Sequence, residues 1–258
     1  MLQGTGSTMK ITILCILTFV VNTLACADTL KLAVASNAFK AMKDIGARFE
    51  QQSGHKILIS AGSTSKLYTQ ILNGAPFDIF LAANEREPAS LEKKELVLPG
   101  SRFTYAIGRL ALYSKDPARI GSDGIAYLRG DHYQRLAMAN PATAPYGHAA
   151  QEVLKSLGLW QTIESRLVRG ENIGQAFQYT ATGNVDAGFV AWSDVKQQSG
   201  GVSGSYWLVP QNLYTPLRQQ AVILKRSRYP QTAQAFFAYL RSDAIRGVLE
   251  NDYGYGSE

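Results

Sequence analysis

The sequence has very few residues suited to covalent or metal-dependent catalysis. Only two of its 258 residues are cysteines and three are histidines. Cys15 and Cys26 both lie in an N-terminal segment that we expect to be removed. The mature chain would then have no thiol, which excludes disulfides, cysteine–metal sites and a cysteine nucleophile. The histidines, His55, His132 and His148, do not have the spacing of a helical metal motif, although His148 adjoins a loop that could line a cleft.

Clusters of charge are also absent. The formal net charge is +6, but no run of five or more basic residues and no basic–aromatic stripe occurs. A protein that tracks a nucleic-acid backbone needs such a pattern. We therefore expect a solvated basic surface and no nucleic-acid partner, and the charge alone does not identify a ligand.

One long apolar run is present, and it has the parts of a secretory signal peptide. Lys10 precedes the run ITILCILTFVVNTLA, and small residues surround Ala25-Cys26-Ala27. The run is shorter than the roughly 20 residues of a membrane span. We predict a signal peptide at residues 1–27, Asp28 as the mature N-terminus, and export of a soluble protein to the periplasm. Lipidation of Cys26 is an alternative, disfavoured by the lack of a leucine three positions upstream.

Strands and helices alternate along the rest of the chain. Apolar or alternating runs predict strands at 30–35, 56–61, 77–83, 103–114, 136–139, 187–192 and 219–225. Apolar residues at helical spacing, several followed by glycine, predict helices at 39–49, 67–72, 148–157, 173–183 and 236–249. This β-α-β-α-β order is typical of an α/β protein with a parallel sheet covered on both faces.

The chain has no internal repeat, low-complexity tract or flexible linker. Two lobes joined by extended crossovers, near 105–109 and 210–219, would explain this. We predict that lobe I comprises residues 28–106 and 215–258, and that lobe II comprises residues 107–214.

Four strand-to-helix turns share a polar, uncharged character. They are 35–37 (ASN), 62–65 (GSTS), 141–147 (PATAPYG) and 171–174 (ENIG). Ligands of open α/β sheets bind at such turns, and helix N-termini attract anions through their free N–H groups. Ser, Thr and Asn are also ordinary helix caps, so one turn alone would mean little. Four turns, two in each lobe, predict an anion site.

The only basic residue in or directly after the first two turns is Lys66, which we expect to be solvated. A site of neutral donors suits a fully ionised oxyanion. Phosphate near neutral pH keeps a proton that needs an acceptor, and only Glu171 is close to these turns. We therefore rank molybdate, tungstate or sulfate above phosphate.

An enzymatic interpretation has weaker support. Residues 63–66 match the S-x-x-K pattern of serine acyl-enzymes, but residues 90–93 match it too, and neither K-T-G nor G-x-S-x-G occurs. An exported serine hydrolase using Ser63 remains an alternative. Our expectation is a protein with no catalytic residue.

Five segments together resemble the periplasmic molybdate-binding proteins (ModA) of bacterial ABC transporters. They are AVASNAF at 33–39, ISAGSTSKLYTQILNGAPFDIFLAA at 59–83, GSRFTYAIGRLALYS at 100–114, NPATAPYGHAAQEVLKSLGL at 140–159, and ENIGQAF followed by GFVA at 188–191. The resemblance covers essentially the whole mature chain. It implies a type II periplasmic-binding-protein fold, with two lobes that are each a mostly parallel sheet flanked by helices and that are joined by two crossover strands.

The resemblance also implies a function. A monomer without a cofactor would hold molybdate or tungstate by hydrogen bonds between its lobes and deliver it to a membrane permease. A binding protein for another oxyanion such as sulfate, or for a small organic anion, is the alternative.

Matched position by position, the resemblance places the ligand contacts on the same four turns. They are Ser36, Asn37, Ser63, Thr64 and, through backbone N–H groups, Tyr146 and Ile173. No protein atom would contact the metal directly. Some members of the family also use a tyrosine hydroxyl from the strand at which this sequence has Ala191. We expect Asn37 to supply the donor that is missing there.

Overall fold

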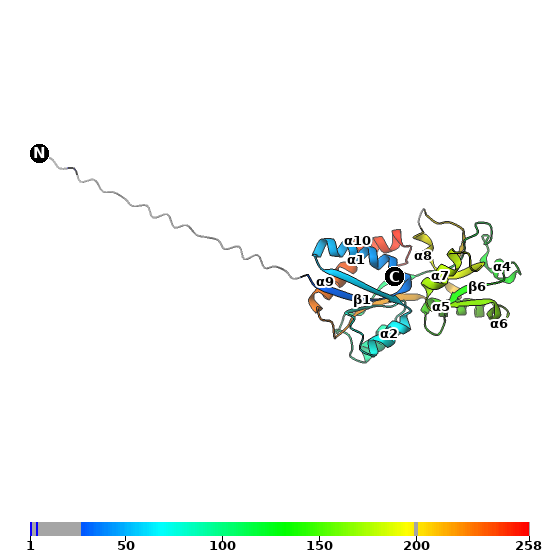
Figure 1. Cartoon of the computed structure of the whole chain (residues 1–258), viewed down its shortest axis with the longest axis horizontal. Helices are drawn as coiled ribbons and strands as arrows, with labels where there is room; N and C mark the ends of the chain where they lie inside the picture. The colour runs from blue at the N-terminus through cyan, green and yellow to red at the C-terminus, as the bar shows by residue number, and fades with distance from the viewer. Residues whose placement is uncertain (2–3, 5–26, 199–200, 258) are drawn as a thin grey trace.

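The computed structural model of the chain describes residues 1, 4, 27–198 and 201–257. The expected signal peptide and both cysteines lie outside the described residues, apart from Met1, Gly4 and Ala27. The described residues form two lobes, each built on a five-stranded sheet covered by helices (Figure 1). No helix in this part of the chain is long and apolar enough to cross a bilayer.

The first sheet has the strand order β2-β1-β3-β10-β4, and only β10 runs against the other strands. Its strands are β1 (Thr29–Ala35), β2 (Lys56–Gly62), β3 (Ile79–Leu81), β4 (Phe103–Gly108) and β10 (Leu217–Ile223). Alternate residues of β1 serve opposite faces: Leu32 packs towards α1, α9 and α10, whereas Ala33 packs towards α2 and α3. The helices are α1 (Phe39–Ser53), α2 (Thr64–Leu72), α3 (Arg86–Lys93), α9 (Pro230–Leu240) and α10 (Asp243–Gly247).

The second sheet repeats this plan with the order β7-β6-β8-β5-β9, in which β5 is the antiparallel strand. Its strands are β5 (Leu110–Ser114), β6 (Leu136–Ala139), β7 (Leu167–Gly170), β8 (Ala187–Ala191) and β9 (Ser205–Leu208). The helices around it are α4 (Gly124–Arg129), α5 (Pro145–Ser156), α6 (Trp160–Ile163), α7 (Ile173–Ala181) and α8 (Trp192–Lys196). Short irregular turns are η1 (Ser36–Ala38), η2 (Glu164–Arg166), η3 (Gln211–Leu213) and the π-turn η4 (Val248–Asp252).

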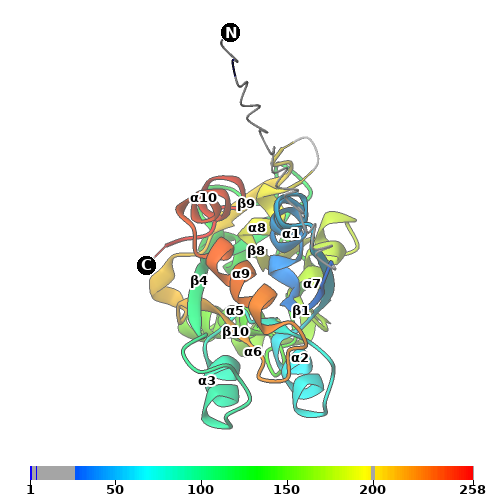
Figure 2. The same cartoon turned by 90° about the vertical axis from the view of Figure 1, so that its left-hand side faces the viewer.

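The chain passes between the sheets twice, first between Gly108 and Leu110 and then between Leu208 and Leu217. It returns to the first lobe to form β10, α9 and α10, and Figure 2 shows α9 and α10 on the same side of the molecule as α1. The expected fold class, two mostly parallel sheets in two lobes, is confirmed. The lobe boundaries at 106/107 and 214/215 stay predictions.

Three expected elements differ in detail. The run at 103–114 is two strands, because the chain changes sheets at Arg109, whose carbonyl accepts from the N–H of Trp192. The run at 77–83 pairs only from Ile79 to Leu81. The last helix breaks after Leu240, and Ser242 caps a second helix by accepting from the N–H of Ile245.

Gly188 of β8 tests the close packing of lobe II. A Cβ atom there would lie 2.4 Å from Thr180 Oγ1 and 2.9 Å from the Cβ of Ala137. We expect Gly188→Ala to lower the free energy of unfolding by about 1–3 kcal/mol, the usual cost of overpacking. Gly121→Ala is the control, because no atom lies within 4 Å of the added Cβ. Denaturant unfolding measures both, and equal stabilities would contradict the packing described here.

Candidate functional site

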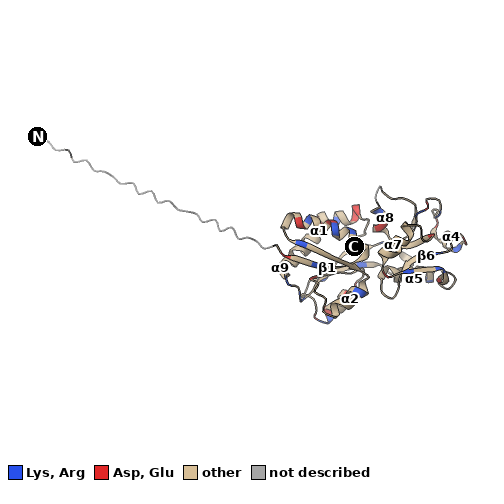
Figure 3. Ribbon diagram, viewed as in Figure 1, with Lys and Arg blue, Asp and Glu red and all other residues tan. Residues whose placement is uncertain are grey.

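All six sequence-predicted residues line one small cavity between the lobes. It encloses about 180 Å³ of empty space. Its lining residues are Ala35, Ser36, Asn37, Gly62, Ser63, Thr64, Ala83, Ala144, Pro145, Tyr146 and Ile173. None of them carries a charge, although basic and acidic residues are interspersed over both lobes (Figure 3). The polar groups facing a ligand here are hydroxyls, amides and backbone N–H groups.

The N-terminus of α2 provides the first group of donors. Ser63 is the cap residue, and its hydroxyl is buried without a hydrogen-bond partner. Thr64 Oγ1 accepts from the N–H of Ala83 at 3.1 Å, which leaves its own proton free to donate. The N–H of Ser65 reaches across the lobes to the carbonyl of Thr143 at 3.2 Å. The N–H of Thr64 has no acceptor within the helix, since the first turn of a helix leaves its N–H groups free.

The N-terminus of α7 is arranged in the same way from the opposite lobe. Asn172 caps the helix by accepting from the N–H of Gln175 at 3.0 Å. The N–H of Gly174 donates to Ser36 Oγ across the lobes at 3.3 Å. In both helices the second residue therefore bonds to the other lobe, and the N–H of the first residue, Thr64 or Ile173, is left for a ligand.

In α5 the first helical residue is Pro145, which has no N–H, so the first free backbone donor belongs to Tyr146. The tyrosine hydroxyl is engaged elsewhere, because it accepts from Gln219 Nε2 at 3.1 Å. The backbone N–H is thus the group that Tyr146 offers to the cavity.

Asn37 lies in the turn η1 and is almost fully buried. Its Nδ2 donates to Gln219 Oε1 at 2.9 Å and to Tyr255 Oη at 3.2 Å. Its Oδ1 is buried and has no hydrogen-bond partner. In this arrangement the unoccupied atom of the amide is an acceptor, whereas a fully ionised oxyanion needs a donor.

The two lobes are in direct contact around the cavity. Besides the two backbone bonds above, Lys66 of α2 pairs with Glu171 across the lobes at 2.9 Å. Lys66 is exposed, as expected, but it is paired. The side chains are 50% and 67% exposed, so solvent screening limits this pair to about 0–1 kcal/mol. It assists closure only weakly, and the bonds made by the helix N-termini set the geometry.

The groups that follow the cavity inwards are uncharged near neutral pH. Burial raises the pKa of Tyr105, Tyr146 and Tyr255 well above the usual tyrosine value. Asp194 of α8 is also buried, and burial raises its pKa to about 7, with the positive charge of Lys40 opposing the shift. Around neutral pH this carboxyl is therefore largely protonated, which keeps negative charge away from an anion site.

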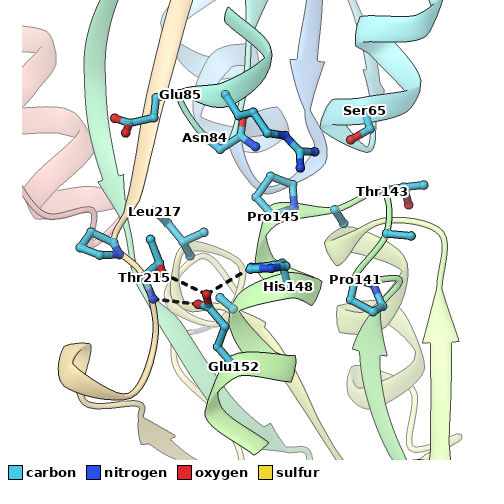
Figure 4. A pocket seen from close by; sticks show the side chains of 15 residues that line it. Ser65, Asn84, Glu85, Pro141, Thr143, Pro145, His148, Glu152, Thr215 and Leu217 are labelled. Carbon is cyan, nitrogen blue, oxygen red and sulfur yellow. Dashed lines mark hydrogen bonds and ion pairs between the residues drawn. The ribbon is translucent and has the colours of Figure 1, made fainter. Parts of the chain in front are cut away.

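A wider pocket adjoins the cavity and has a different character (Figure 4). His148 lines this wider pocket and is absent from the cavity lining. It pairs with Glu152 at 3.4 Å, and Glu152 accepts from the N–H of Thr215 at 2.8 Å. Among the described residues no cluster of three His, Cys, Asp or Glu side chains could hold a metal ion.

Neither S-x-x-K match has the contacts of an activated serine. Ser63 Oγ has no hydrogen-bond partner, and Lys66 is paired with Glu171. Ser90 Oγ contacts the hydroxyl of Tyr68 at 2.8 Å. A serine nucleophile requires a base within hydrogen-bond reach, so this geometry favours a binding role for Ser63.

The fold and the interlobe cavity define a solute-binding protein, and comparison with known proteins agrees. The model of the family described as bacterial extracellular solute-binding protein matches residues 30–256. The chain therefore belongs to this family. Because the match spans both lobes, it includes every residue that lines the cavity.

Within the family the chain is similar to molybdate-binding proteins. It is 46% identical to the molybdate-binding protein ModA of Azotobacter vinelandii, over 90% of this chain and 93% of that protein. It is 42% identical to ModA of Rhodobacter capsulatus, over 91% and 90% of the two chains. The structure of the periplasmic molybdate-binding protein of Azotobacter vinelandii superimposes with a TM-score of 0.86 at 37% identity, covering 89% and 99% of the chains. The resemblance inferred from the sequence is confirmed.

The raised pKa of Asp194 predicts how stability depends on pH. Its folded value of about 7 lies above the unfolded value of about 3.9. The stability that the protonated carboxyl contributes is therefore present below the unfolded pKa and is lost as the pH rises through 7. We expect the wild type to lose about 3 kcal/mol relative to Asp194→Asn between about pH 5 and about pH 8.5. Denaturant unfolding at both pH values measures this, and parallel pH profiles would contradict it.

Proposed function

We propose that the chain is the solute-binding component of an ABC transporter and that it captures molybdate or tungstate in the interlobe cavity. The observation that carries the proposal is the convergence of uncharged donors from both lobes on one cavity without a charged residue. The names of the 46% and 42% identical relatives, both molybdate-binding proteins, support this ligand. We further propose that the protein acts as a monomer in the periplasm, after removal of the signal peptide, and hands its ligand to a membrane permease.

Binding follows from the helix termini. An oxyanion placed in the cavity would accept from the N–H groups of Thr64, Tyr146 and Ile173 and from the hydroxyls of Ser63 and Thr64. Each helix also presents the positive end of its dipole. These donors are fixed by the fold, so little conformational entropy is lost when the anion binds. No covalent step and no cofactor is required.

Closure is coupled to binding because the donors come from different lobes. An open form would separate α2 from α5 and α7, and the anion would bridge them. A ligand shifts such an equilibrium only as far as its affinities for the two states differ. Because three helix N-termini meet the anion only in the closed form, most of its binding free energy favours closure. A permease could then recognise the loaded protein by its closed shape.

Selectivity follows from size and protonation. Neutral donors at fixed positions suit one metal–oxygen distance, and we expect molybdate and tungstate to bind more tightly than the smaller sulfate. Hydrogen phosphate should bind most weakly, since its proton needs an acceptor and no carboxylate lines the cavity. Calorimetric titration of the mature chain with each anion measures the order. Tighter binding of sulfate or phosphate than of molybdate would refute the assignment.

The two hydroxyls of α2 provide a test within the site. We expect Ser63→Ala and Thr64→Ala each to weaken molybdate binding by about ten-fold or more, because each removes a hydrogen bond to a charged group. Thr69→Ala is the matched control, since Thr69 lies on the same helix but is exposed and bonds to the carbonyl of Ser65. If both variants bind as tightly as the control, these hydroxyls are not ligands. Labelling of Ser63 by a fluorophosphonate probe would instead favour the hydrolase alternative.

A further inference from the structure

Gln219 links the cavity to both lobes through three buried contacts. It is fully buried on β10, and its Oε1 accepts from Asn37 Nδ2 at 2.9 Å and from Tyr105 Oη at 2.8 Å. Its Nε2 donates to Tyr146 Oη at 3.1 Å. Asn37 and Tyr146 are both cavity residues, one from each lobe. One amide therefore contacts the cavity residues of both lobes from behind.

The backbone is shaped to place this amide. The register of β10 against β4 shifts between Gln219 and Gln220, so that Tyr105 has no partner across the ladder. Such bulges redirect side chains and are common beside functional sites. A Cβ atom on Gly108 would lie 2.4 Å from Tyr146 Oη and 2.6 Å from Gln219 Nε2. The glycine thus leaves the space in which the two polar groups meet.

The present arrangement of the two amides leaves Asn37 Oδ1 buried and unpartnered. An unsatisfied buried acceptor is costly, and it would repel a fully ionised oxyanion. Reversing both amides removes the conflict. Gln219 Nε2 would then donate to Asn37 Oδ1, Tyr146 Oη would donate to Gln219 Oε1, and Tyr105 Oη, which already lies 3.4 Å from the carbonyl of Ala82, would donate there. Asn37 Nδ2 would be released towards the ligand.

Neither amide can reverse alone. If only Asn37 turned, its Oδ1 would face Gln219 Oε1, and two acceptors would meet in a buried site. If only Gln219 turned, its Nε2 would face Asn37 Nδ2, and two donors would meet. The orientation of the Asn37 amide is thus set by Gln219.

We propose that Gln219 is a positioning residue that determines selectivity for the oxyanion, because its amide decides whether Asn37 presents a donor or an acceptor to the cavity. The donor orientation fits a fully ionised oxyanion such as molybdate. The acceptor orientation fits a protonated one such as hydrogen phosphate. This inference rests on the proposed oxyanion-binding function, and it assigns the donor lost at Ala191 to a relay through β10.

The test is a double-mutant cycle between Gln219 and Asn37. Gln219→Met keeps the length of the side chain but removes both its hydrogen-bonding atoms. We expect it to weaken molybdate binding by about ten-fold in the wild type and to have no further effect when Asn37 is already alanine. It should also lower the ratio of molybdate to phosphate affinity. Gln220→Met is the control, because Gln220 is the buried neighbour that bonds to Arg102 and Thr104 instead.

The outcomes separate the two proposals. If the wild type fails to bind molybdate, the proposed function itself is wrong. If it binds, but Gln219→Met weakens binding equally with and without Asn37, or leaves the affinity unchanged, only the role of Gln219 is refuted. Thermal unfolding of every variant shows whether it has folded.

A second measurement needs no variant. In nuclear magnetic resonance spectra of the wild type, the side-chain amide signals of Asn37 and Gln219 should shift together on saturation with molybdate, because both amides change partners. The signal of Gln220 should stay in place. A Gln219 signal that does not move at saturation would overturn the proposal.

Discussion

The structure depends on how the first turns of three helices use their N–H groups. In α2 and α7 the second residue donates to the opposite lobe, through Ser65 to Thr143 and through Gly174 to Ser36. The first residue of each helix is thereby left facing the cavity. In α5, Pro145 has no N–H, which gives the same role to Tyr146. Closing the lobes and assembling the anion site are therefore one event.

The absence of charge in the cavity is consistent with this design. A lysine or arginine would bind an anion in the open form as well as in the closed form, and it would not report closure. Free N–H groups have direction, and they act together only when the lobes meet. The nearby buried acid, Asp194, is largely protonated near neutral pH because burial raises its pKa to about 7. The basic surface therefore says little about the site itself.

The sequence predicts those parts of the fold that depend on local pattern. The ends of α1 and α5 follow from periodic apolar residues and from Gly54 and Gly158, which adopt positive φ after the helices. The four turns are recognisable because Ser, Thr, Asn and Pro at a helix start have known capping roles. Short elements such as α8, with five residues, have too few turns to show a period.

Contacts between distant residues could not be predicted in this way. The partners of Gln219 lie 182, 114 and 73 residues away in the sequence, and the bulge that redirects it depends on pairing between β4 and β10. The exchange of sheets at Arg109 likewise depends on Trp192 and Tyr214, which contact the crossover from other elements. The orientation of the Asn37 amide is set by the same distant contacts.

The most direct test of the central claim is the anomalous diffraction signal of molybdenum in crystals of the mature chain grown with molybdate. We predict one strong peak in the interlobe cavity, with oxygen atoms about 3 Å from the backbone nitrogens of Thr64, Tyr146 and Ile173. A peak in the wider pocket beside His148, or against lysine and arginine side chains on the surface, would contradict the account.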